Sequence, residues 1–223
     1  MQETLKDPPG AGAIALMEAA EQLIAEKGID GVSSREVARL AGHKNHSAVN
    51  YNFGSYDGLV EALIGHRSAP ISQQRKELFA ALLAAPAVPS LEDLVGLMVR
   101  PMAAQLLAPE GQHHFLNLLS QLLTRDHWQQ VFLENRRRDH TLLRIGEQVE
   151  ARLHALLPSA VCHERLQRLG NQIVHCVAEW DSRIRAGTLE ATPEALNWRI
   201  EDFIVCSVAA LTAPTRPTSP EKQ

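Results

Sequence analysis

Cysteine and histidine stand side by side twice in the sequence, as Cys162–His163 and as His175–Cys176. Thiolate and imidazole are the groups that bind zinc and that serve thiol sensors. On one helix, however, the two pairs are about thirteen residues apart, or ~20 Å at a rise of 1.5 Å per residue. One chain therefore cannot close a tetrahedral site from both pairs, and we predict no metal site. Buried, apolar cysteines are favoured, and a site shared between two copies of the chain stays open.

The segment "ENRRRDH" places three arginines in a row, Arg136 to Arg138. Such a cluster could bind a phosphate group or an acidic effector. The run falls within an expected long helix, in which Glu134 and Asp139 can pair with arginines at helical spacing. We therefore interpret the run as an exposed, ion-paired face of that helix.

Nothing in the sequence has the order or spacing of a catalytic site. There is no Ser-His-Asp order, no glycine-rich phosphate loop and no carboxylate–histidine metal motif. We therefore expect no enzymatic activity, no catalytic residue and no cofactor. The net charge of −4 excludes a generally basic protein that coats nucleic acid, so DNA binding would require a local surface.

The composition favours helices. Hydrophobic residues make up 45% of the chain and aromatic residues only 4%, while alanine and leucine abound and β-branched runs are scarce. No apolar stretch approaches the ~20 residues of a membrane span, and no signal peptide is present. Three cysteines, the third being Cys206, are too few for a disulfide framework. We expect an all-α, cytoplasmic protein without a membrane partner.

Proline and glycine positions divide the chain. Residues 1–12 and 213–223 are polar or rich in proline and are expected to be disordered. Pro70 lacks an amide hydrogen, so it should break or strongly kink a helix that starts after Ser55. We therefore predict a helix-turn-helix domain over residues 13–67 and a helical effector-binding and dimerisation domain over residues 70–212.

Apolar residues at three- and four-residue spacing predict the helices of both domains. In the small domain they cover Ala13–Lys27, Ser34–Ala41 and His46–Asn52, with a fourth helix after Ser55. In the larger domain they cover Ser72–Ala84, Leu91–Leu107, Gln112–Thr124, His127–Leu157, Cys162–Arg185 and Thr192–Leu211.

The last two expected helices carry the most regular apolar stripes, and two copies of such a pair could form a four-helix interface. We predict a homodimer whose interface consists of Leu166, Leu169, Ile173, Val177, Trp180, Ile184, Ile200, Phe203, Ile204 and Val208. Aromatic and imidazole side chains are the candidates for an effector pocket, with plain core packing as the alternative. They are His113, His114, Phe115, Trp128, Phe132 and again Trp180.

Two short helices joined by a tight turn stand between longer helices in the small domain. This order is typical of a helix-turn-helix, in which the second short helix enters the major groove of DNA. A groove ~12 Å wide admits one helix with small and polar outer side chains. Here that surface would be the segment from Lys44 to Asn50, with Val49 and Phe53 directed inward.

The stretch from Met17 to Leu63 resembles the N-terminal domain of the tetracycline-repressor (TetR) family. The matching features are a first helix that ends in "AEKG", the second helix and turn "VSSREVARLAG", and "VNYNFGS" before the next helix. The rest of the chain matches in length and helical character alone. The resemblance implies a dimeric repressor that a small-molecule effector releases from a palindromic DNA operator.

The resemblance also implies which residues contact DNA. Ser34 and Arg35 would approach it at the start of the second helix, and the fork of Arg35 suits guanine O6 and N7. The groove face would consist of Lys44, Asn45, Ser47, Ala48 and Asn50, and the residues at or beside phosphate would be Tyr51, Asn52 and Tyr56.

Three features depart from the family pattern. The turn has one residue more than the commonest spacing, Asn52 replaces a usual histidine, and Tyr56 replaces a usual lysine or arginine that holds phosphate. A neutral hydroxyl gives a weaker phosphate contact than a cation does. We therefore expect operator binding to depend only weakly on salt, because each lost ionic contact lowers the slope by roughly one.

Two other interpretations stay open. The first is a helical small-molecule-binding protein or enzyme whose N-terminal domain is merely structural. The second is a redox or metal sensor of the same fold that acts through Cys162 and Cys176. In the repressor interpretation, the helix break near Pro70 would be part of the hinge between effector site and DNA-binding domain. The sequence identifies neither the effector nor the operator.

Overall fold

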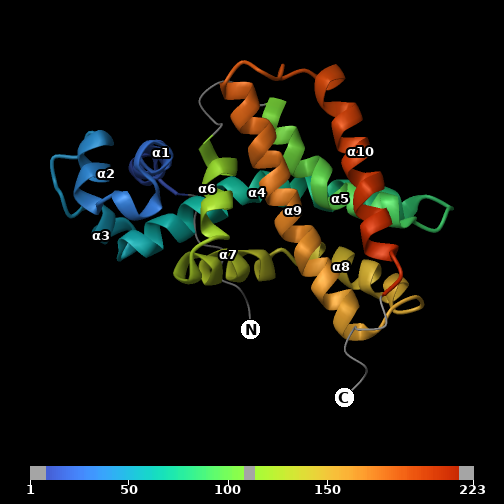
Figure 1. Cartoon of the computed structure of the whole chain (residues 1–223). Helices are drawn as coiled ribbons and strands as arrows, with labels where there is room; N and C mark the ends of the chain where they lie inside the picture. Colours follow the sequence, from blue (N-terminus) through green and yellow to red (C-terminus); the bar gives the residue numbers. More distant parts are fainter. Residues whose placement is uncertain (1–8, 108–113, 216–223) are drawn as a thin grey trace. The chain divides into compact units, whose positions relative to one another are not determined.

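The computed structural model describes residues 9–107 and 114–215, and every regular element in these ranges is a helix (Figure 1). This confirms the all-α expectation. The chain divides into two compact units, unit 1 up to Arg67 and unit 2 from Ser68 onward. Both ends that were expected to be disordered lie mostly outside the described residues. Residues 11 and 12 already belong to the first helix.

Unit 1 consists of α1 (Ala11–Lys27), a 3-10 turn (Ile29–Gly31), α2 (Ser34–Leu40), α3 (Ala48–Phe53) and the first part of α4 (Tyr56–Ala84). Unit 2 contains the rest of α4, then α5 (Leu91–Ala103), a 3-10 turn (Ala104–Leu107), α6 (His114–Leu122), α7 (Asp126–Arg138), α8 (His140–Leu153), α9 (Ser159–Arg185) and α10 (Pro193–Thr212).

The helices of unit 1 surround a small apolar core. α1 packs against α2, and α2 packs against α3. The residues with no accessible surface include Leu16, Ile24, Ile29, Val37, Val49, Leu59 and Leu63. Because each helix contributes one apolar face to this core, the opposite faces of α2 and α3 remain available to solvent or a partner.

Both ends of α2 are determined by local hydrogen bonds. At its start, the Ser33 hydroxyl accepts from the Glu36 N–H at 3.3 Å and the Glu36 carboxylate accepts from the Ser33 N–H at 3.0 Å, which is a capping box. At its end, Gly42 has a φ of 75°. The Gly42 N–H donates to the Arg39 carbonyl and the His43 N–H to the Ala38 carbonyl, which is a Schellman motif. A glycine is favoured there because side chains disfavour positive φ.

α4 is continuous from Tyr56 to Ala84, with Pro70 inside it. The predicted break at Ser68–Pro70, with a separate helix from Ser72 onward, is therefore wrong, and the alternative of a strong kink there stays a prediction. A proline removes the one hydrogen bond that its N–H would donate to the carbonyl four residues earlier. Here that carbonyl belongs to His66, and both residues are exposed, so water can take the place of the missing donor.

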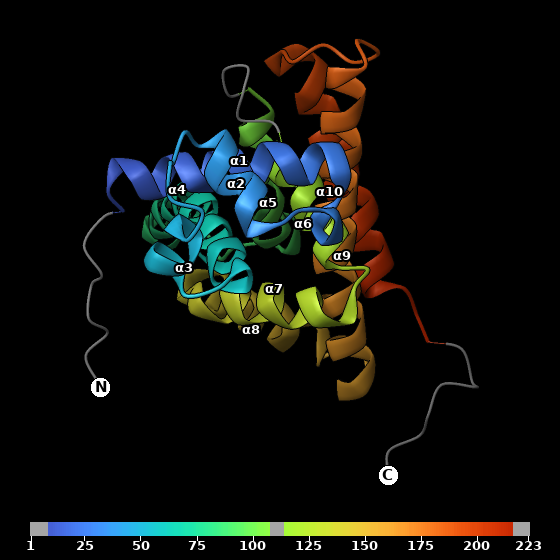
Figure 2. The ribbon, with the colours of Figure 1, turned by 90° about the vertical axis from the view of Figure 1, so that its left-hand side faces the viewer.

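Unit 2 has one large core, in which α5 packs against α8, α9 and α10, and α6 packs along α9. α9 and α10 run side by side, as Figures 1 and 2 show. The core includes Leu94, Val95 and Val99 of α5, Ile145 and Val149 of α8, and the inner residues of α9 and α10. Every described helix is too short or too polar to cross a membrane.

The expected helix His127–Leu157 is in fact two helices, α7 and α8, which Asp139 separates. The Asp139 carboxylate accepts a hydrogen bond from the Leu142 N–H at 2.9 Å and so caps the start of α8. A short carboxylate competes in this way for backbone donors and favours helix ends over helix interiors. Asp139 therefore lies at a junction between helices and not on a helix face.

The apolar stripes of α9 and α10 are buried within one chain. All ten residues predicted for the dimer interface belong to the core of unit 2 or pack against it. Val177 and Ile204 are 0% and 1% exposed, because α5 and α6 cover the stripes. A side chain without accessible surface cannot contact a second chain, so the prediction is wrong for the buried members. The outward face of α10 instead carries Trp198 and Val205, 59% and 61% exposed.

Candidate DNA-binding surface and effector cavity

α3 has one buried face and one exposed face. Val49 is fully buried, whereas Asn50, Tyr51 and Asn52 are exposed, Tyr51 with 89% of its surface. The exposed face thus offers amide and phenol groups that can both donate and accept hydrogen bonds. This is the chemistry that base edges in a major groove require.

Ala48 does not belong to the exposed face, although it was predicted there. It is 6% exposed and forms part of the core. The helix begins at Ala48 and not near His46, and this register directs Ala48 and Val49 together toward the interior of unit 1. Its prediction as a groove contact is therefore wrong.

The segment between α2 and α3 carries the exposed residues Lys44, Asn45 and Ser47. The Asn45 carboxamide oxygen accepts a hydrogen bond from the Ser47 N–H at 2.9 Å. This local bond orders the turn in the way that asparagine commonly does. Three exposed polar side chains thus stand in the few residues that precede α3.

At the start of α2, Arg35 is exposed and Ser34 is half-buried. The neighbouring Glu36 pairs with Lys27 of α1, whose Nζ lies 2.7 Å from the Glu36 Oε1. The hydrogen bond from Lys27, together with those from Ser33, lowers the pKa of Glu36 to about 2. Lys27 neutralises the Glu36 carboxylate. Glu36 therefore repels a phosphate or other anion bound at Arg35 less strongly than an unpaired carboxylate would.

Two residues predicted at or near phosphate have donors that are engaged inside unit 1. The Tyr56 hydroxyl donates to the Ile29 carbonyl at 3.0 Å, and burial raises the pKa of Tyr56. The Asn52 amide donates to the Ala48 carbonyl at 2.8 Å. The hydroxyl has one proton, so Tyr56 can donate to phosphate only after it gives up the bond to Ile29.

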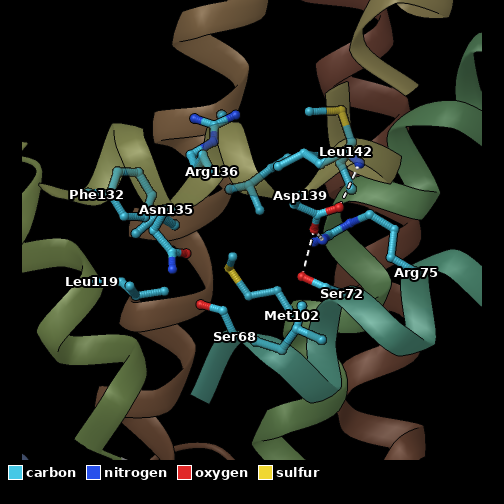
Figure 3. A pocket seen from close by; sticks show the side chains of 15 residues that line it. Ser68, Ser72, Arg75, Met102, Leu119, Phe132, Asn135, Arg136, Asp139 and Leu142 are labelled. Atoms are coloured by element: carbon cyan, nitrogen blue, oxygen red, sulfur yellow. Dashed lines mark hydrogen bonds and ion pairs between the residues drawn. The ribbon is translucent and has the colours of Figure 1, made fainter. Parts of the chain in front are cut away.

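A cavity of about 60 Å³ lies within unit 2 (Figure 3). Its lining is mostly apolar, with a few polar and charged groups. The lining residues are Ser68, Ile71, Ser72, Arg75, Met98, Met102, Leu119, Phe132, Asn135, Arg136, Asp139, Leu142, Gly170, Ile173 and Val174.

A buried ion pair between Arg75 of α4 and Asp139 forms part of the cavity wall. The Ser72 hydroxyl also donates to the Asp139 carboxylate, at 2.7 Å, and the Arg75 Nε donates to the Leu97 carbonyl at 3.2 Å. Burial lowers the pKa of Arg75, and the Asp139 carboxylate opposes this effect. These bonds tie α4, α5 and the junction of α7 and α8 together.

The arginine run does not form one exposed face. Arg137 and Arg138 are exposed, but Arg136 is partly buried and lines the cavity. Asp139, which was expected to pair with neighbouring arginines at helical spacing, pairs with Arg75 instead. The interpretation of the run as an ion-paired surface is therefore wrong for Arg136 and Asp139.

Of the predicted pocket residues that the structure describes, Phe132 lines this cavity and the others do not. Phe115 and Trp128 are buried elsewhere, and the Trp180 ring packs edge-on against Phe203 at 6.3 Å. His114 begins α6, and His113 lies outside the described residues. Sequence reasoning missed Ser72, Arg75 and Asp139, because polar and charged residues at helical spacing are typical of a solvent-exposed helix face. The one local signal was Asp139, because an aspartate directly after a helix-forming run is typical of a helix cap.

The three cysteines are free thiols. Cys162 is buried, and burial raises the pKa of Cys176 to about 11. A thiol with a raised pKa is mostly protonated at neutral pH and reacts slowly. Within residues 9–107 and 114–215, no group of three or more histidine, cysteine or acidic side chains is placed to hold a metal ion.

An exposed α3 that follows α2 across an ordered turn, with its other face packed in the core, defines a helix-turn-helix DNA-binding regulator. Residues 16–63 match the family model described as bacterial regulatory proteins, tetR family. Residues 16–63 are thus similar to the DNA-binding domain of this family, as the resemblance implied, and the chain is a DNA-binding transcription regulator.

Solved structures share the fold over nearly the whole chain. The fatty acid degradation regulator FadR from Bacillus halodurans has 13% identity and a TM-score of 0.58, over 94% of this chain and 99% of that one. NalD from Pseudomonas aeruginosa, described as the secondary repressor of a multidrug efflux pump, has 18% identity and a TM-score of 0.57, over 91% and 98%. A TetR-family regulator from Marinobacter aquaeolei VT8 has 20% identity and a TM-score of 0.54, over 89% and 94%. None of the curated proteins matches the sequence.

Proposed function

We propose that this regulator is a repressor that binds a palindromic operator as a homodimer and leaves it when a small molecule binds in unit 2. The observation that carries the proposal is the two-faced α3. Ala48 and Val49 anchor the helix in the core, and Asn50 and Tyr51 extend from its opposite face. Such a helix is rigid enough to enter a groove and polar enough to interact with base edges.

The DNA contacts divide into base and phosphate contacts. Arg35 is the candidate for a bidentate contact to guanine, because it is exposed and its neighbour Glu36 is paired with Lys27. Lys44 is an exposed cation beside α3 that suits a phosphate. The remaining candidates for contact are Ser34, Asn45, Ser47, Asn50, Tyr51 and Asn52.

The outward faces of α9 and α10 are the proposed dimer contact. Trp198 and Val205 expose large apolar surfaces there, and a groove of about 410 Å³ runs between the helices beside Cys176, Phe203 and Cys206. A symmetric dimer would present two α3 helices about 34–36 Å apart or somewhat more, which matches half-sites on one side of the DNA. The operator is therefore expected to be an inverted repeat.

The effector part of the proposal rests on the cavity in unit 2. A ligand changes operator affinity only by its different affinity for the two states of the protein. The cavity walls come from α4 and from helices of the larger core, and α4 also belongs to unit 1. Because this one helix is part of both units, it is the proposed mechanical link between the cavity and the DNA-binding surface. Since the partner is chromosomal DNA, the proposed compartment is the cytoplasm.

Selection of genomic DNA fragments with the purified full-length chain tests the proposal. We expect the recovered fragments to share one inverted repeat, bound at nanomolar concentration. The double variant Arg35→Ala/Asn50→Ala should lose this binding, whereas Lys76→Ala, an exposed cation in unit 2, should retain it. Recovery of fragments without a common repeat would contradict the proposal.

A further inference from the structure

The charged groups of the cavity do not cancel one another. Its lining contains two guanidinium groups, Arg75 and Arg136, and one carboxylate, Asp139. Arg75 pairs with Asp139, and its Nε donates to the Leu97 carbonyl. The Asp139 carboxylate accepts from Arg75, from Ser72 and from the Leu142 N–H. One positive charge, that of Arg136, is left over.

The Arg136 guanidinium has no anion bonded to it among the described residues, because the nearby Asp139 carboxylate pairs with Arg75. Within the described part of the chain it forms no hydrogen bond and no ion pair. Its Cζ lies 5.8 Å from the centre of the Phe132 ring, and the guanidinium is repelled by Arg75 and attracted by the Asp139 carboxylate, which is itself bonded to Arg75. Burial, and then Arg75, lowers the pKa of Arg136, and the Asp139 carboxylate opposes this effect. A partly buried cation without a partner is unfavourable, and an anion in the cavity would remove that cost.

Gly170 provides the space in which Arg136 sits. A Cβ atom at this position of α9 would lie 2.6 Å from the Arg136 Nη1 and 2.8 Å from its Nη2. A glycine within a helix costs about 1 kcal/mol relative to alanine, so the guanidinium pocket is a reason for its presence. The sequence therefore accommodates Arg136 against the cavity wall.

The remainder of the lining is apolar and adaptable. Met98, Met102, Leu119 and Phe132 form much of it, and methionine side chains adjust readily to different shapes. Roughly 10–15 Å³ of such volume holds one water molecule. The cavity of about 60 Å³ thus has room for a small head group and the first carbons behind it.

We propose that the cavity binds an apolar organic acid, whose carboxylate pairs with Arg136 and whose hydrocarbon part lies along Met98, Met102, Leu119 and Phe132. The inference rests on the proposed function in one respect, since it takes the cavity to be the effector site. Ser68 and Asn135 also line the cavity, and their polar side chains would help to orient the acid (Figure 3).

Calorimetric titration of the full-length protein with butanoate, octanoate and benzoate tests the proposal, with 1-octanol as the uncharged control. At least one acid should bind, and octanoate should bind at least tenfold more tightly than 1-octanol. Arg136→Gln should weaken acid binding at least tenfold. Arg137→Gln removes an exposed arginine of the same helix and should change it less than twofold. Lack of binding by all three acids, or equal effects of the two variants, would overturn the proposal.

Gly170→Ala is a second test of the role of Arg136, to be used if Arg136→Gln does not fold. It leaves every charge in place but displaces the guanidinium, so acid binding should again fall at least tenfold at unchanged helix content. Unchanged binding in this variant would count against the role of Arg136.

Operator binding without ligand, measured on the same samples, separates this inference from the proposed function. Operator binding together with failure of all three acids to bind would overturn the inference and leave the repressor proposal standing. Acid binding that depends on Arg136, without any operator binding, would support the inference and contradict the repressor proposal.

Discussion

Arg75 of α4 and Asp139, at the junction of α7 and α8, form a buried ion pair across 64 positions of the sequence (Figure 3). The side chains of Arg75 and Asp139 are 4% and 11% exposed. Each charge therefore depends on the other for solvation, and the pair holds two distant parts of unit 2 beside the cavity.

Replacement of Asp139 should destabilise the protein strongly. Asp139→Ala leaves the Arg75 guanidinium buried without its counterion, and such losses cost about 3–5 kcal/mol. The loss of the α8 cap adds about 1 kcal/mol. Urea unfolding measures the change. As a control, Glu201→Gln breaks the exposed pair between Arg100 and Glu201 and should cost less than about 1 kcal/mol. A similar small loss for Asp139→Ala would contradict the importance of the buried pair.

The Tyr56 hydroxyl should stabilise unit 1 and contribute nothing to phosphate binding. Tyr56→Phe removes the hydrogen bond to the Ile29 carbonyl, which should lower the free energy of unfolding by about 1 kcal/mol. The salt dependence of operator affinity should be shallow in the native protein and unchanged in the variant. Titrations of operator affinity at several salt concentrations test this. A slope that is steep in both proteins, or that falls in Tyr56→Phe, would show that the prediction is wrong.

Glu36 should make the stability of unit 1 sensitive to acid. Its pKa in the folded chain is about 2, against an ordinary value of 4.5. A lowered pKa means that the stabilisation is fully present above pH 4.5 and is lost as the pH falls through about 2. Thermal unfolding of the native protein and of Glu36→Gln between pH 2 and 7 measures it. The difference in Tm should be largest near neutral pH and should vanish toward pH 2; a constant difference would exclude this carboxylate as the cause.

Pro70 should weaken α4 locally without ending it. Pro70→Ala restores an N–H that can donate to the His66 carbonyl, so the free energy of unfolding should rise, by at most about 3 kcal/mol. If this weak point is part of the hinge, the variant should also change the operator affinity or the response to an effector. Unchanged values of both would argue against a hinge at Pro70. Lys76→Ala, an exposed substitution further along α4, is the matched control.

The helix-turn-helix could be predicted from the sequence because the interactions that define it are local. Ser33 and Glu36 cap α2 across three residues, and Gly42 ends it through bonds to Ala38 and Arg39. Such signals are present in a short stretch of sequence and need no distant partner. The predicted start of α3 at His46 was two residues too early, and the misplacement of Ala48 on the groove face follows from that error.

The cavity of unit 2, which we propose as the effector site, and the outward face of unit 2 were decided by tertiary structure alone. An apolar stripe shows that one face of α9 or α10 is buried, but the same pattern suits a core and an interface. α5 and α6 cover the stripe, so Val177 and Ile204 are core residues and Trp198 faces outward. Likewise, no sequence pattern joins Arg75 to Asp139, because their pairing depends on how α4 packs against a helix junction 64 positions away. The sequence by itself determined the DNA-binding unit. The uncompensated charge of Arg136 depends on the tertiary structure, because the fold pairs Asp139 with Arg75 and leaves Arg136 in the cavity wall.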